Sequence, residues 1–245
     1  MADTSPSAKL EIGRVIRQTF GVLGRNFGPL FLMALLLVGV PALIQNLGNP
    51  GVLGPILPKG VPLLILVGLL LFLAGYYVLV GALTSATVAD LNGRKLDLGE
   101  CLRVGVRRFW PLLGLTIVTG LAVAVGLFLL IVPGLWLMTV WAVVGPVKVV
   151  EDVPFGQTFG RSLALTEGNR GRVTGLLLLY GVFLVLLSAL STALDIAGGV
   201  FAAVVTALVQ TLNALVAASL TAVLYFELRR VREGVGPESL ASVFD

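Results

Sequence analysis

The segment Pro111–Val147 constrains this chain most, because it runs for 37 residues without a charged side chain. A helix that crosses the hydrocarbon core of a bilayer needs about 20 apolar residues. The segment is therefore too long for one crossing and too apolar for a soluble domain. Pro133-Gly134 predicts the break between two antiparallel helices that are joined by almost no loop.

Other uncharged blocks predict four further crossings. Charged residues make up 12% of the 245 residues and hydrophobic residues 57%, whereas soluble domains carry about 25% charged residues. The first block follows a charged stretch, so no cleaved signal peptide is expected. The four blocks are Leu30–Leu47, Val61–Ala89, Val173–Leu194 and Val200–Phe226.

Three amphipathic stretches lie before the first, third and fifth crossings. They cover Leu10–Phe27, Asp97–Phe109 and the residues after Pro154. Apolar residues recur every three or four positions in these stretches, and the stretches carry too many charges to cross a membrane. Both features are typical of helices that lie at a membrane surface. Asp97 and Glu100 have the spacing of a helix-capping box. We therefore predict an all-α integral membrane fold, with six transmembrane helices as three hairpins, each preceded by an amphipathic interfacial helix on the cytoplasmic side.

The basic residues predict the orientation. Of 17 Lys and Arg, 16 fall on one side of these six crossings and only Lys59 falls on the other. Positive residues collect on the cytoplasmic side of membrane proteins. Both termini are therefore expected in the cytoplasm.

The chain forms one polytopic domain, residues 1–245, in which three repeats are predicted at 8–92, 93–152 and 153–234. Leu10–Arg17 aligns with Leu96–Arg103, and Val153–Phe159 follows the same pattern. Repeats are common in membrane folds. The alternative is that any amphipathic stretch beside a membrane has this pattern.

The composition excludes several chemistries. The chain has no histidine and one cysteine, which removes histidine bases and ligands, an intramolecular disulfide and a cysteine metal cluster. No nucleophile–base pair or phosphate-binding loop can be assembled. We expect no catalytic residue, no metal, no cofactor and no nucleic-acid partner.

Arginines of the amphipathic stretches are the candidate contacts to anionic lipid, since each basic group near such a surface contributes about 1 kcal/mol. Asp90 and Glu151, at the cytoplasmic ends of the second and fourth crossings, are expected to pair with Arg94, Lys148 or arginines of the amphipathic helices. The candidate headgroup contacts are Arg14, Arg17, Arg103, Arg107, Arg161 and Ser162.

A polar stripe along the sixth crossing is the other candidate site. It contains Thr206, Gln210, Asn213 and Thr221 at helical spacing. Such a stripe lines a solute path or forms hydrogen bonds between helices, and the second interpretation is favoured.

Nearly the whole chain resembles the membrane domain found on some bacterial glycerophosphoryl diester phosphodiesterases and its stand-alone relatives. The resemblance lies in the start from Gly13 through Asn26-Phe27, in Pro133-Gly134, Pro146, Glu151 and Arg161–Gly168, and in the ending Leu224–Gly234. It implies a multi-pass membrane domain without activity of its own, in a bacterial plasma (inner) membrane. In the fused enzymes catalysis belongs to a separate barrel with histidines and metal-binding carboxylates, which this sequence lacks.

We therefore expect a non-catalytic multi-pass membrane protein that organises anionic lipid, a partner protein or a second copy of itself at the cytoplasmic face. The alternative is a small transporter or channel for an uncharged or weakly polar solute. No charge lies at mid-membrane depth in any crossing, which counts against ion coupling.

Overall fold

The computed structural model describes residues 9–50, 52–53, 60–94 and 96–234. This part of the chain is helical and contains no strand. Lys59, the basic residue expected opposite the others, lies outside the described residues. The helices are α1 (Ile12–Arg25), α2 (Phe27–Ala34), the π-helix η1 (Leu35–Gly39), α3 (Val40–Leu47), α4 (Pro62–Leu91), α5 (Leu98–Leu129), α6 (Ile131–Val140), α7 (Val144–Glu151), α8 (Phe155–Thr166), α9 (Arg170–Ala197) and α10 (Gly199–Glu233).

Six helical spans in the described residues are long and apolar enough to cross a membrane. Two of them combine consecutive short helices, α2 to α3 and α6 to α7. The other four are α4, α5, α9 and α10. The chain is therefore an integral, multi-pass membrane protein, as its uncharged blocks predict.

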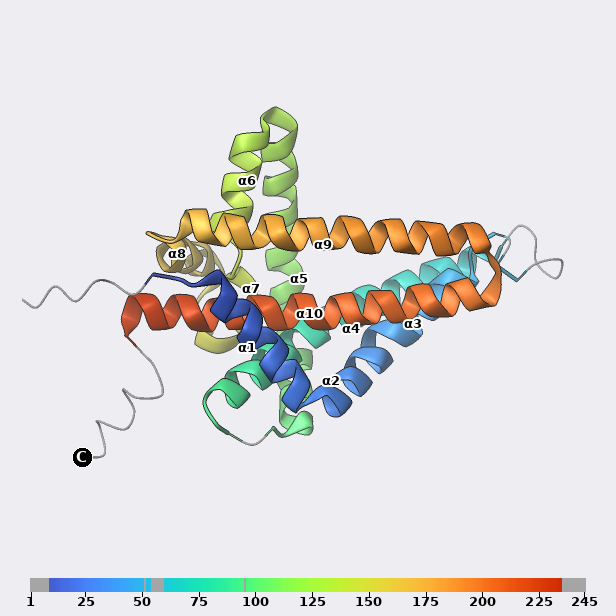
Figure 1. The fold of residues 1–245 in the computed structure, drawn as a ribbon, viewed down its shortest axis with the longest axis horizontal. Helices are drawn as coiled ribbons and strands as arrows, with labels where there is room; N and C mark the ends of the chain where they lie inside the picture. The colour runs from blue at the N-terminus through green and yellow to red at the C-terminus, as the bar shows by residue number, and fades with distance from the viewer. Residues whose placement is uncertain (1–8, 51, 54–59, 95, 235–245) are drawn as a thin grey trace, which may run out of the picture.

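Consecutive helices pack against each other, and they do not share one direction. α3 packs on α4, α4 on α5, α5 on α6, and α9 on α10. Figure 1 shows α9 and α10 running side by side, whereas α5 and α6 rise together in a different direction. The outer end of the α5–α6 pair is strongly exposed, with Phe128 90% and Val132 77% accessible. Such apolar surface needs lipid or protein around it.

The structure corrects two expected helix boundaries. Asp97 caps α5, its Oδ1 accepting from the Gly99 and Glu100 amides. α5 then runs without interruption to Leu129 and carries Pro111 inside it, although a separate amphipathic helix was expected there. The turn expected at Pro133-Gly134 lies instead at the extended residue Leu130. Pro133 falls in the first turn of α6, where its missing N–H removes no helical hydrogen bond.

Pro41 explains the π-helix in the first span. Proline has no N–H, so the Leu37 carbonyl four residues earlier lacks its usual helical donor. The backbone widens over Leu35–Gly39, and the Val40 amide donates to the Leu35 carbonyl. The Leu37 carbonyl then lies against Gly75 of α4, where a Cβ would be 1.7 Å from its oxygen. Only glycine fits at this contact between α4 and the π-helix.

Gly75→Ala therefore should destabilise the protein by about 1–3 kcal/mol, because α4 must move away from the π-helix. The matched control is Gly120→Ala on α5, where an added Cβ meets nothing within 4 Å and alanine improves helix propensity. Thermal unfolding in detergent measures both variants. Equal melting temperatures would contradict the close approach.

Candidate functional site: an intramembrane cavity and a charged end

The fourth span is broken in the middle, between α6 and α7. Pro146 has no N–H and cannot donate to the Ala142 carbonyl. The Val144 amide donates to the Trp141 carbonyl at 3.2 Å, and not to the Val140 carbonyl as it would in a continuous helix. The freed Val140 carbonyl accepts a hydrogen bond from the Ser162 hydroxyl at 2.8 Å. A freed backbone group inside a membrane needs such a partner. Ser162 of α8 therefore stabilises the break.

This role replaces the headgroup contact expected of Ser162. Its side chain is fully buried, so it faces the protein interior and not the lipid headgroups. The break itself was not expected, because Leu135–Val147 has the composition of one continuous helix. Gly145-Pro146 was the sequence signal that could have indicated it.

A cavity of about 450 Å³ lies beside this break. Its walls come from α4, α5, α7, α9 and α10, and Ala142 in the break itself also lines it. Leucines form much of the wall, and no charged residue of the described chain lines it. In membrane proteins, irregular backbone at depth is tolerated where it is buried or lines a cavity.

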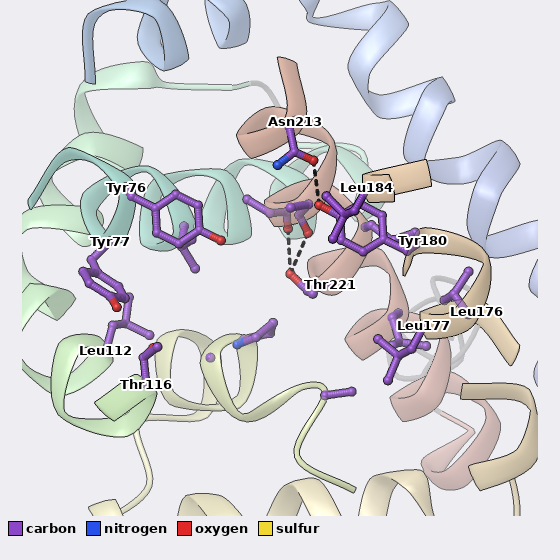
Figure 2. Close-up of a pocket in the computed structure, with 18 residues that line it drawn as sticks. Tyr76, Tyr77, Leu112, Thr116, Leu176, Leu177, Tyr180, Leu184, Asn213 and Thr221 are labelled. Atoms are coloured by element: carbon purple, nitrogen blue, oxygen red, sulfur yellow. Dashed lines mark hydrogen bonds between the residues drawn. The ribbon is translucent and has the colours of Figure 1, made fainter. Parts of the chain in front are cut away.

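Several polar groups project into this mainly apolar cavity (Figure 2). The Tyr180 hydroxyl of α9 donates to Asn213 Oδ1 of α10 at 2.8 Å. The Thr221 hydroxyl donates to the carbonyls of Ala217 and Ala218 in its own helix. Figure 2 also shows the Tyr76 hydroxyl of α4 directed toward the middle of the cavity. Tyr76 and Tyr180 were not among the expected site residues.

The predicted polar stripe is divided between this cavity and a second one. Asn213 and Thr221 line the first. Thr206 and Gln210 line a second cavity of about 360 Å³ near the turn between α9 and α10, together with Asn46. Gln210 Oε1 is buried there without a hydrogen bond. One face of α10 therefore borders both cavities.

An ion-pair network joins α7, α8 and α10 at one end of the molecule. Arg161 donates to Glu151 through Nε at 2.6 Å and through Nη2 at 3.0 Å, and it also contacts Glu233. The Tyr225 hydroxyl donates to Glu151 at 2.9 Å, and Arg229 donates to Glu233 at 2.8 Å. The Glu151 carboxylate raises the pKa of Arg161. Two expected site residues, Arg161 and Glu151, are thus bound to each other.

Two further carboxylates at this end hold helix junctions. Asp90, at the end of α4, accepts from Arg25 at 2.5 Å and from Asn26 at 2.7 Å, so it fixes the corner between α1 and α2. Asp152 follows α7 and contacts Arg108 of α5 and Lys148 at 3.2 Å. These two cations lower the pKa of Asp152 to about 2.

Glu227 is a buried carboxylate that the sequence analysis missed. Its side chain is 1% exposed between α1 and α10, with Arg14 at 3.7 Å and Arg230 at 3.5 Å. Arg14 also pairs with Glu11 at 3.0 Å. Because the sixth crossing is expected to end at Phe226, the charged run that follows it predicts an exit into water. The signal was the helical spacing of Leu220, Leu224 and Glu227, which places Glu227 on the buried face.

The remaining expected arginines are exposed. Arg17, on α1, and Arg103 and Arg107, on the first turns of α5, lie at the surface. None of the three forms an ion pair with another described residue. Their guanidinium groups are available to an external anion.

Comparison of the chain with protein-family models, with curated proteins and with solved structures found no match. The fold and the cavities define the class, an all-helical multi-pass membrane protein. The resemblance to the membrane domain of the phosphodiesterases stays a prediction.

Arg161→Met should lower the free energy of unfolding by about 1–3 kcal/mol, because it leaves the partly buried Glu151 without its cation, while Glu233 keeps Arg229. Glu151→Gln/Arg161→Met should cost less than the sum of the two single changes, since the pair is removed together. A double-mutant cycle by thermal unfolding measures this coupling. Additive effects would mean that the contact contributes no net stability.

Proposed function

We propose that this chain is a non-catalytic protein of a bacterial inner membrane that binds anionic lipid at its cytoplasmic face. The observation that carries the proposal is the division among its arginines. Arg14, Arg25, Arg108 and Arg161 are held by carboxylates of the same chain, whereas Arg17, Arg103 and Arg107 are exposed.

The surroundings of these three arginines support membrane contact. Phe20, one turn from Arg17, is 60% exposed, and Val106 and Trp110, beside Arg103 and Arg107, are 58% and 75% exposed. Exposed apolar groups next to basic groups are typical of a helix face that enters the headgroup region. The apolar side chains supply burial and the arginines supply attraction to phosphate.

The proposed arrangement is three hairpins, each preceded by an amphipathic segment on the cytoplasmic side, with both termini in the cytoplasm. α1 precedes the first span and α8 precedes α9, while the first turns of α5 continue directly into the third span. The ion pairs join the ends of α4, α7 and α10 to these segments. The threefold repeat and the kinship to the phosphodiesterase membrane domain belong to the same proposal.

The test compares the retention of phosphatidylglycerol by native mass spectrometry. Arg17→Gln/Arg103→Gln/Arg107→Gln should weaken retention by roughly fivefold for each arginine removed, as expected for about 1 kcal/mol per basic group. The effect should diminish at high salt because exposed charges are screened.

The matched control, Arg229→Gln/Arg230→Gln/Arg232→Gln, loses the same charge. All three arginines of this control are already paired, with Glu233, Glu227 and Glu167. It should retain lipid nearly as well as the wild type. Equal losses in the two triple variants would reduce the effect to net charge and contradict the proposed site.

A second candidate function is transport of a small uncharged solute. It is favoured by the polar face of α10, which passes from Gln210 in one cavity to Asn213 in the other. Gln210→Leu/Asn213→Leu should then abolish glycerol or urea flux in proteoliposomes. Ser188→Leu, which changes an exposed polar residue of α9 that bonds only its own helix, is the control. Flux equal to that of empty liposomes for the wild type would reject transport of these solutes.

A further inference from the structure

We propose that the 450 Å³ cavity beside the broken fourth span binds one neutral amphiphile, a lipid with an uncharged head that carries hydroxyl or ester groups. Diacylglycerol represents this chemical class. The site lies among α4, α5, α7, α9 and α10. It is separate from the arginines proposed to bind anionic lipid and does not depend on them.

The wall of the cavity fits a hydrocarbon chain. Its volume lies within the range of about 300–1,000 Å³ that is usual for ligand sites. Leu112 of α5, Leu177 and Leu184 of α9, and Leu224 of α10 line it. A small polar solute would leave these leucines uncovered, whereas an acyl chain would cover them at no polar cost.

The polar groups of the cavity fit a neutral hydrogen-bonding head. Asn213 Oδ1 is occupied by the Tyr180 hydroxyl, while its amide nitrogen and the Tyr76 hydroxyl donate to no other described residue. Asn213 comes from α10 and Tyr76 from α4, both line the cavity, and Figure 2 shows the Tyr76 hydroxyl directed toward its middle. They can donate to an ester carbonyl or a hydroxyl oxygen.

The absence of charge in the described lining excludes a charged head at this depth. A phosphate or ammonium group removed from water needs an opposite charge or several strong donors. The charged residues of the cytoplasmic end, such as Arg161 and Glu151, bind one another and do not line the cavity. An anionic phospholipid is therefore a poor occupant, and a neutral lipid is a good one.

The cavity opens toward the region occupied by membrane lipid. Two of its lining residues, Thr116 of α5 and Leu184 of α9, are exposed at the surface of their spans. Leu184 is 37% accessible, and its neighbours Val185 and Leu186 are 66% and 64% accessible. A lipid can enter sideways from the bilayer along this apolar surface.

Gly145 provides a variant that fills the cavity without disturbing the backbone. It lines the cavity, and the nearest atom to an added Cβ is a Leu112 methyl at 3.9 Å. Gly145→Leu therefore places a side chain in the space proposed for the ligand. Gly181→Leu on α9 is the matched control, because an added Cβ there meets nothing within 4 Å and Gly181 does not line the cavity.

The experiment uses a diacylglycerol with a photoreactive acyl chain, added to the full-length protein in phosphatidylcholine liposomes. Wild type and Gly181→Leu should be labelled on the cavity-facing parts of α5 and α9, and Gly145→Leu should lose at least nine-tenths of this labelling. Tyr76→Phe, which removes one donor, should weaken binding about 2- to 10-fold. Unlabelled diacylglycerol should compete.

Three results would overturn the proposal. Labelling of Gly145→Leu at the wild-type level would show that the cavity is not the site. Competition by phosphatidylglycerol as strong as that by diacylglycerol would contradict the neutral head, and competition by glycerol alone would assign the cavity to a small solute. The triple arginine variant should keep diacylglycerol labelling, so failure here is distinct from failure of the anionic-lipid proposal.

Discussion

This structure depends on one constraint: each backbone N–H and C=O group inside the membrane needs a hydrogen-bond partner from the protein. A proline within a span, such as Pro41 or Pro146, removes one helical hydrogen bond, and no water is present at that depth to replace it. The chain compensates for the lost hydrogen bonds in two ways. At Pro41 the helix widens into a π-turn, and the Leu37 carbonyl lies against Gly75. At Pro146 the helix breaks, and the Ser162 hydroxyl binds the freed Val140 carbonyl.

The break at Pro146 borders the 450 Å³ cavity. Ala142 and Gly145 line the cavity there, beside the irregular backbone between α6 and α7. Tyr180 and Asn213 then bond to each other across α9 and α10 on the opposite side of the cavity. The same break therefore positions α8, through Ser162, and borders the candidate site.

The charged end shows why basic residues in a membrane protein cannot all be assigned to lipid. Arg161 and Arg25 fall on amphipathic stretches, yet each is held by a carboxylate at the end of another span. These contacts join segments distant in sequence, as Arg161 and Glu233 illustrate. What remains for an external partner is the smaller set of Arg17, Arg103 and Arg107. The proposed lipid contact rests on that remainder.

The sequence alone determined that the chain crosses a membrane, because uncharged blocks of about 20 residues and caps such as Asp97 are local signals. It determined six spans and approximate helix ends. Tertiary structure alone decided that α5 continues through Pro111, that Ser162 and Glu227 are buried, and that Tyr76 and Asn213 line the same cavity. Hydropathy and helix propensity depend on neighbouring residues in the chain, whereas burial, ion pairing and cavity shape depend on residues far apart in sequence, which only the packed helices bring together.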